Sequence, residues 1–135
     1  MNTALFCYGT LQFPEVMERV TGRRFESTPA VLAEFARYRI ENAVYPGVIA
    51  ENGAATEGVL YFDVDSDSLH HLDVFEGAPY VRRQLPVCAA NGETVMAEVY
   101  VIDGQKRTVL TQEPWDKQEF SRFNLQTYLA RIKPK

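Results

Sequence analysis

The residue best placed for chemistry is Glu76, at the end of a short helical pattern. Leu69, Leu72 and Phe75 recur at spacings of three, and Glu76 follows Leu72 by four positions. Such positions share one face of a helix, so the carboxylate would lie on the apolar side. Apolar neighbours and the negative end of the helix dipole both raise the pKa of a carboxylate toward the range useful for proton transfer. The alternative is a frayed last turn with Glu76 in solvent.

A second candidate is the turn Tyr8-Gly9-Thr10-Leu11, which directly follows an apolar run. Gly9 allows the backbone to approach a ligand closely, and successive N–H groups at such a turn can hold a carboxylate or an oxyanion. The hydroxyl of Thr10 adds a donor. The alternative is a simple strand-to-loop turn with Tyr8 in the core. Neither glycine-rich nucleotide-binding pattern is present, so this is not a nucleotide loop.

Two later strand-like runs carry polar residues. Glu98 and Tyr100 alternate onto the same face of their run. If this face points inward, Tyr100 would lie beside Glu76. If it points outward, as we expect for Glu98, the Glu98 carboxylate would lie in solvent. Tyr80 and Arg82 also share a strand face. The two residues could frame a pocket together, or Arg82 could hold an acidic residue in place.

The elements that must position these residues are mostly strands joined by short turns. Strands are predicted at 4–8, 29–35, 37–40 (with a bulge or turn near Ala36), 48–51, 57–64, 80–88 and 94–102, with hairpin turns at Asn52-Gly53 and Asn91-Gly92. Helices are predicted from Pro14 to about Val20, from Asp65 or Ser66 to Glu76, and from about Pro114 to Ala130. This order predicts an α+β fold: one domain over 1–135, with a small mixed, mostly antiparallel β-barrel and flanking helices.

Composition excludes several classes of function. The net charge is −4 and no Lys/Arg stripe occurs, so we expect no nucleic-acid partner. No apolar run approaches the ~20 residues of a membrane span, and the first residues lack the basic region of a secretory signal, which favours a cytoplasmic location. Cys7 and Cys88 are expected to be buried free thiols. No zinc spacing occurs, and the adjacent His70 and His71 diverge on a helix, so no metal is expected.

The two candidate stretches, taken together, resemble the gamma-glutamylcyclotransferase-like superfamily. The matching motifs are Tyr8-Gly9-Thr10-Leu11 after an apolar strand and Leu72-Asp73-x-Phe75-Glu76-Gly77-x-x-Tyr80-x-Arg82. The narrower resemblance is to the branch containing the plant avirulence-induced-gene-like proteins and gamma-glutamylamine cyclotransferase. It implies a small mixed barrel, a glutamyl-binding loop made of Tyr8, Gly9, Thr10 and Leu11, and Glu76 as general acid/base, with Tyr80 and Tyr100 near the cavity.

The resemblance also implies an activity. A gamma-glutamyl amine or amino acid would be converted to 5-oxoproline and free amine by attack of its own α-amino group, without a metal or organic cofactor. The expected partner is this small molecule, and the chain would be a monomer or a weak homodimer. The alternatives are a non-catalytic module that binds a small carboxylate or amide in the same cavity, and an amide hydrolase. The segment from 103 onward has no diagnostic match, so the leaving amine stays open.

Overall fold

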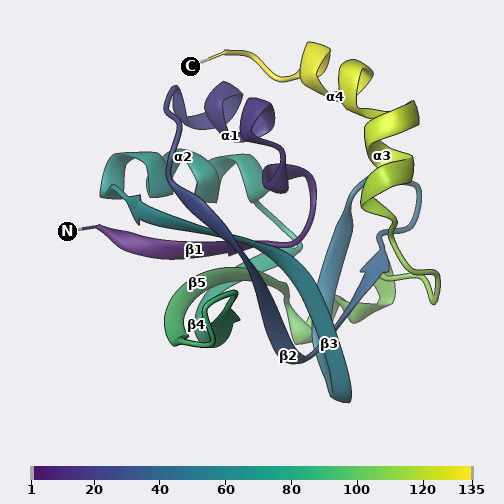
Figure 1. The fold of residues 1–135 in the computed structure, drawn as a ribbon. Helices are drawn as coiled ribbons and strands as arrows, with labels where there is room; N and C mark the ends of the chain where they lie inside the picture. Colours follow the sequence, from purple (N-terminus) through teal and green to yellow (C-terminus); the bar gives the residue numbers. More distant parts are fainter. Residues whose placement is uncertain (1, 135) are drawn as a thin grey trace.

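Five strands close into a barrel in the computed structural model, which describes residues 2–134 (Figure 1). The strands are β1 (Thr3–Cys7), β2 (Ser27–Arg39), β3 (Pro46–Val64), β4 (Tyr80–Ala89) and β5 (Thr94–Ile102). Their order around the barrel is β1-β3-β2-β4-β5, and β5 closes onto β1 in parallel while the other neighbours pair antiparallel. The predicted fold class, a mixed and mostly antiparallel barrel with flanking helices, is confirmed.

The helices gather on one side of the barrel (Figure 1). They are α1 (Pro14–Thr21), α2 (Ser66–Glu76), α3 (Lys117–Phe123) and α4 (Leu125–Arg131), with short 3-10 helices η1 (Thr10–Gln12) and η2 (Gly104–Val109). None of the helices within residues 2–134 has the length and apolar character that crossing a membrane requires.

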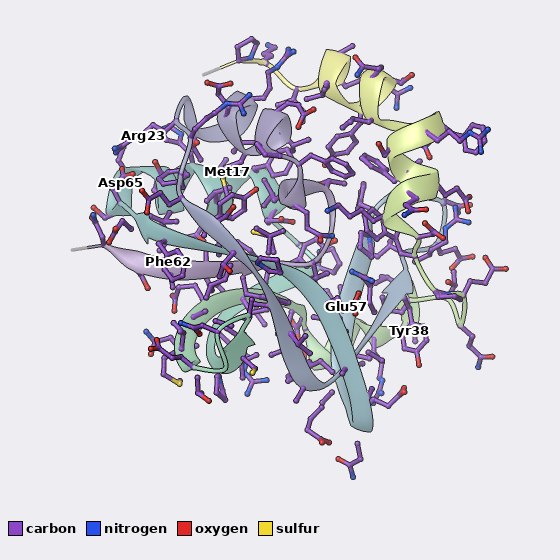
Figure 2. The ribbon with its side chains drawn as sticks, viewed as in Figure 1. Met17, Arg23, Tyr38, Glu57, Phe62 and Asp65 are labelled. Atoms are coloured by element: carbon purple, nitrogen blue, oxygen red, sulfur yellow. The ribbon has the colours of Figure 1, made fainter. Side chains whose placement is uncertain are left out.

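Alternation along β1 divides the core into two parts. Phe6 and Tyr8 point into the barrel and pack with apolar side chains of the other strands. Leu5 and Cys7 face the helices, where they join Met17 of α1, a fully buried side chain labelled in Figure 2. The end of β1 therefore lies where the barrel interior meets the helical layer.

The predicted hairpin turn at Asn52-Gly53 is wrong, because β3 continues through it as one strand of 19 residues. Gly53 does adopt a left-handed φ of 81°. It stands opposite an irregularity of β2, where Glu34 also has a positive φ and its carboxylate accepts a hydrogen bond from the Gly53 N–H at 2.9 Å. The residues thus form a bulge that bends the β2–β3 ribbon. Of the bulge or turn predicted near Ala36, the structure has the bulge, two residues earlier, at Glu34.

Two further expectations differ from the structure. The C-terminal helix predicted from Pro114 to Ala130 is divided into α3 and α4, because the backbone leaves the helical region at Asn124, where φ is −126°. Both cysteines are free, but only Cys7 is buried, whereas Cys88 is exposed.

Candidate active site

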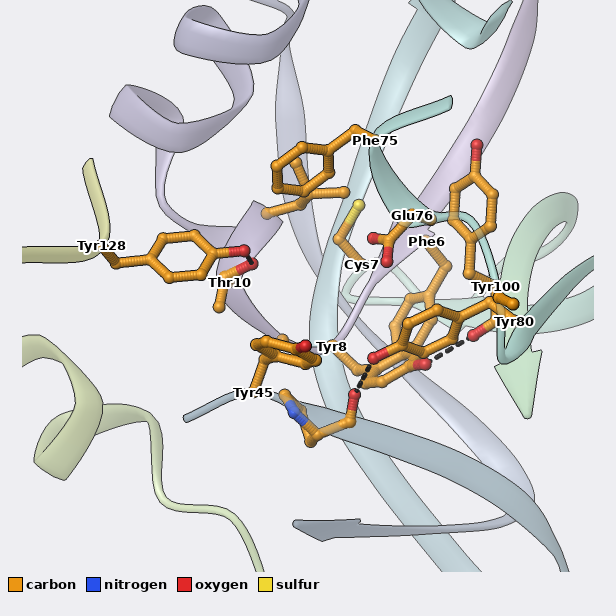
Figure 3. Close-up of a pocket in the computed structure, with 14 residues that line it drawn as sticks. Phe6, Cys7, Tyr8, Thr10, Tyr45, Phe75, Glu76, Tyr80, Tyr100 and Tyr128 are labelled. Carbon is orange, nitrogen blue, oxygen red and sulfur yellow. Dashed lines mark hydrogen bonds between the residues drawn. The ribbon is translucent and has the colours of Figure 1, made fainter. Parts of the chain in front are cut away.

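A cavity of about 150 Å³ opens at the end of β1, between the barrel and the helices (Figure 3). Seven of the residues considered from the sequence line it: Tyr8, Gly9, Thr10, Leu11, Glu76, Tyr80 and Tyr100. Arg82 and Glu98 do not line it. The seven come from β1, η1, the end of α2 and strands β4 and β5. The fold therefore brings the two sequence motifs to a single cavity.

The position of Glu76 follows from how α2 begins and ends. Asp65 caps the helix by accepting from the N–H of Ser68 at 3.0 Å, and it also pairs with Arg23 (Figure 2). Leu72 is fully buried beneath the helix. Gly77 then leaves the helix with a φ of 55° and donates its N–H to the carbonyl of Asp73 at 3.0 Å. Glu76 is consequently the last helical residue and lies on the face that meets the barrel, as predicted.

The carboxylate of Glu76 is directed into the cavity (Figure 3). Burial raises its pKa from 4.5 to about 8. Although the residue as a whole is only partly buried, the carboxylate faces the enclosed cavity and not the bulk solvent, which accounts for the shift. The frayed-end alternative is therefore wrong.

No positive charge compensates this carboxylate inside the cavity. None of the described residues that line the cavity is Lys, Arg or His. Cys7 and four of the five tyrosines on its walls have a pKa raised, chiefly by burial. Compared with these groups, Glu76 has a pKa close to neutral pH.

Side chains from outside the turn after β1 hold it by donating hydrogen bonds to its backbone carbonyl groups. Arg37 donates to the Tyr8 carbonyl at 2.8 Å, the Gln12 side chain donates to the Gly9 carbonyl at 3.2 Å, and the Tyr61 hydroxyl donates to the Leu11 carbonyl at 2.7 Å. In a planar trans peptide the N–H points opposite to the carbonyl, so the N–H groups of Gly9 and Thr10 point away from these donors. The Gln12 N–H is already used, because it donates to the Gly9 carbonyl at 3.1 Å. The first N–H groups of η1 also lack partners within the helix. This arrangement leaves N–H groups of the turn available for an anion.

Gly9 is required by close packing. A Cβ atom at this position would lie 2.9 Å from Cδ of Pro46, which also lines the cavity. The turn therefore approaches the start of β3 more closely than an alanine would allow.

Three tyrosine hydroxyls on the walls are bonded within the protein. Tyr8 donates to the carbonyl of Tyr100 at 2.5 Å, Tyr80 donates to the carbonyl of Pro46 at 2.6 Å, and Tyr100 donates to Asp73 at 2.6 Å. Two of these bonds are drawn in Figure 3. Burial raises the pKa of each hydroxyl, so all three stay protonated and serve as fixed walls.

An ion-pair network supports the wall from behind. Arg82 donates to both carboxylate oxygens of Asp73, at 2.8 and 3.1 Å, and also to Glu98. Glu98 is only 8% exposed, and one of its oxygens has no hydrogen-bond partner. The expectation of a solvated Glu98 is wrong, because this end of β5 is covered on both faces. Of the two roles considered for Arg82, the structure supports the one in which it holds acidic residues in place.

Half of the cavity lining was not identified from the sequence: Phe6, Cys7, Tyr45, Pro46, Phe75, Ala78 and Tyr128. Phe6 and Cys7 directly precede the first motif, and Phe75 and Ala78 lie within the second, so sequence proximity is a usable signal for them. Tyr128 has none, because its approach depends on the break between α3 and α4. Within residues 2–134, no group of three or more His, Cys, Asp or Glu side chains is arranged to hold a metal ion.

The closed, mixed five-strand barrel with flanking helices is the fold of gamma-glutamyl cyclotransferase-like proteins. The chain belongs to the family described as "Gamma-glutamyl cyclotransferase, AIG2-like", which it matches over residues 5–117. It is 30% identical to AIG2-like protein C of Arabidopsis thaliana over 130 residues, covering 96% of this chain and 75% of that protein.

Solved structures agree with this assignment. A solution structure of an Arabidopsis thaliana protein superposes with a TM-score of 0.76 at 26% identity, covering 96% of this chain and 79% of the other. A structure described as a gamma-glutamyl cyclotransferase superposes with a TM-score of 0.65 at 15% identity, covering 100% of this chain and 90% of the other, a likeness of fold.

Proposed function

We propose that this protein is a gamma-glutamyl cyclotransferase, which converts a gamma-glutamyl amine or amino acid to 5-oxoproline and free amine. The observation that carries this proposal is the carboxylate of Glu76, with a pKa of about 8, in one cavity with the Tyr8–Leu11 turn. Family membership points to the same reaction class.

The substrate contains its own nucleophile. The α-amino nitrogen attacks the γ-carbonyl carbon, a carbon–nitrogen bond of a five-membered lactam forms, and the γ-amide bond to the leaving amine breaks. Two protons pass from the attacking nitrogen to the leaving nitrogen, which departs as an ammonium ion. Because the α-amine is protonated near pH 7, a base must first remove a proton.

Glu76 is suited to carry those protons. With a pKa of about 8, its carboxylate is basic enough to accept a proton from the ammonium group, and its acid form can return that proton to the departing nitrogen. An exposed glutamate with an ordinary pKa would be a much weaker base. The burial that raises the pKa is therefore a requirement of the proposed reaction.

The turn supplies the electrostatic part of the mechanism. Its N–H groups would hold either the α-carboxylate of the substrate or the oxyanion that develops on the γ-carbonyl. Tyr8, Tyr80 and Tyr100 would then restrict the glutamyl chain to the folded conformation that cyclisation needs, and such positioning dominates the rates of intramolecular reactions. Their hydroxyl protons are bonded within the protein, so their part is steric.

The test is the identity of the product. Purified protein is incubated with gamma-glutamyl derivatives of amino acids, dipeptides and amines, and 5-oxoproline and free glutamate are measured. The proposal expects 5-oxoproline with stoichiometric release of the amine. Free glutamate in its place would identify a hydrolase, and thermal stabilisation by these compounds without any product would identify a binding module.

A further inference from the structure

One wall of the cavity lies outside both sequence motifs. Tyr45 comes from the segment that precedes β3, and Tyr128 comes from α4 (Figure 3). Tyr128 also lies beyond residue 117, where the match to the family ends. The family match therefore covers Tyr45 but not Tyr128, so half of this wall lies outside what the family shares.

The wall is held in place by aromatic packing. The ring of Tyr45 meets Tyr128 at a centroid distance of 6.5 Å and an interplanar angle of 60°, and Tyr128 packs edge-on against Phe120 at 5.4 Å. Phe120 is 2% exposed and contacts the ring of Trp115 at 5.7 Å. The Thr10 hydroxyl donates to the Tyr128 oxygen at 3.2 Å, which ties the wall to the backbone turn.

The wall also holds the free hydroxyl protons of the cavity. The protons of Tyr8, Tyr80 and Tyr100 are used within the protein. The Tyr128 oxygen accepts from Thr10 and keeps its own proton, and across the described chain no protein acceptor is found for the Tyr45 hydroxyl. Tyr45 and Tyr128 thus present two aromatic rings with free O–H donors at one end of the cavity. Tyr8, Tyr80 and Tyr100 do not occupy that end.

Charge limits what can bind against this wall. The glutamyl group already brings an α-carboxylate into a cavity that contains Glu76, and no Lys, Arg or His lines that cavity within the described residues. A second carboxylate, carried by the leaving group, would add another negative charge to this cavity without a cation to pair with it. An uncharged ring, in contrast, would gain aromatic contacts with Tyr45 and Tyr128.

We propose that Tyr45 and Tyr128 form the leaving-group subsite, and that this subsite selects gamma-glutamyl derivatives of uncharged aromatic amines over those of amino acids and peptides. The inference rests on the proposed cyclotransferase function and narrows its substrate class. Tyr128 is the specificity-determining residue, because it lines the cavity, packs on the aromatic layer beneath the wall and accepts a hydrogen bond from Thr10 of the turn.

The experiment compares three matched amides: gamma-glutamyl-phenethylamine, gamma-glutamyl-phenylalanine, which adds a carboxylate, and gamma-glutamyl-butylamine, which removes the ring. The wild-type kcat/KM for the phenethylamide, measured as 5-oxoproline formation, is expected to exceed each of the others by about tenfold or more. Tyr128→Leu should reduce the phenethylamide-to-butylamide ratio to about threefold or less, mainly by raising KM. Tyr128→Phe should keep most of the ring preference.

Phe123→Leu is the matched control, since Phe123 is an exposed aromatic residue of α3 outside the cavity, and it should leave the ratios unchanged. If Tyr128→Leu does not fold, as judged by circular dichroism, the wild-type comparison decides alone. Equal turnover of the three amides, or preference for the phenylalanine derivative, would overturn the subsite and leave the cyclotransferase function standing. No 5-oxoproline from any amide would overturn both.

Discussion

Two carboxylates of α2 stand one helical turn apart and have opposite surroundings. Asp73 accepts hydrogen bonds from Nε and Nη2 of Arg82 and from the Tyr100 hydroxyl. Glu76 faces the cavity, where burial raises its pKa to about 8 without a compensating cation on the walls. The same helix therefore carries one acid that is fixed by partners and one that is left free to exchange a proton.

The difference assigns separate tasks to the two groups. Asp73 is bound by Arg82 of β4 and Tyr100 of β5, so it anchors the helix end to these two strands. An unpaired, buried carboxylate is destabilising when ionised, and such strain is typical of catalytic acids and bases. The anchor at Asp73 holds the end of α2, and that end sets the direction of Glu76.

The largest expected effect separates the two acids by activity. Glu76→Gln preserves shape and removes the proton carrier, so kcat for 5-oxoproline formation should fall by about 10²- to 10⁴-fold. Asp73→Asn should reduce kcat by about tenfold or less, because it only loosens the anchor. Steady-state assays of both variants measure this. Comparable losses in the two variants, or nearly full activity in Glu76→Gln, would remove the proposed distinction.

The pH dependence of kcat/KM should also reflect the ionisation of Glu76. If Glu76 must be ionised to accept the proton, kcat/KM falls about tenfold per unit as the pH decreases below its pKa of about 8. The alkaline limb belongs to the α-amine of the substrate, so substrates with different amine pKa values should move that limb and leave the acid limb in place. An acid limb near pH 4.5 would mean that the free carboxylate is not perturbed.

Replacing Arg82, the cation that binds Asp73 and Glu98, is expected to lower the free energy of unfolding more than it lowers activity. Arg82→Met leaves Asp73 and the buried Glu98 without their shared partner, and we expect the free energy of unfolding to fall by about 2–4 kcal/mol. Arg82→Lys should recover part of the loss, since a lysine keeps the charge but not the two-armed contact. Urea denaturation measures both variants. An unchanged midpoint for Arg82→Met would show that the network does not anchor the helix.

Sequence reasoning located the site wherever local periodicity decides the geometry. The spacing from Leu69 to Glu76 determines which face of α2 the acid occupies, and glycine at 77 determines where the helix ends. The sequence thus indicated the helix face on which Glu76 lies, and the structure added its surroundings and its raised pKa.

The features that sequence reasoning missed depend on contacts between distant segments. Glu98 is buried because Arg82 on the adjacent strand pairs with it, and the alternation of β5 alone does not reveal that partner. Asn52-Gly53 has the composition of a hairpin turn but lies within a strand that pairs with β2 on both sides of it. Tyr128 reaches the cavity only after the chain bends at Asn124. Each case is decided by tertiary packing, which overrides the local pattern.

The smallest expected effect is on how the free energy of unfolding depends on pH. It is also the effect that distinguishes Glu76 from Asp73 most directly. A folded pKa raised from 4.5 to about 8 means that the native state keeps a proton that the unfolded chain has lost. This contribution to stability is fully present below pH 4.5 and is lost as the pH rises through 8. Glutamine stays neutral throughout, so Glu76→Gln should match the wild type at pH 4 and exceed it by about 1–3 kcal/mol at pH 9, after allowance for partial exposure.

Urea denaturation at the two pH values measures the difference, and Asp73→Asn is the control of opposite sign, since it removes a paired charge and should destabilise the fold at pH 9. A Glu76→Gln variant less stable than the wild type at pH 9 would mean that the ionised Glu76 has a stabilising partner. The acid at the end of α2 would then be a second anchor, and the contrast with Asp73 on which its chemical role depends would be lost.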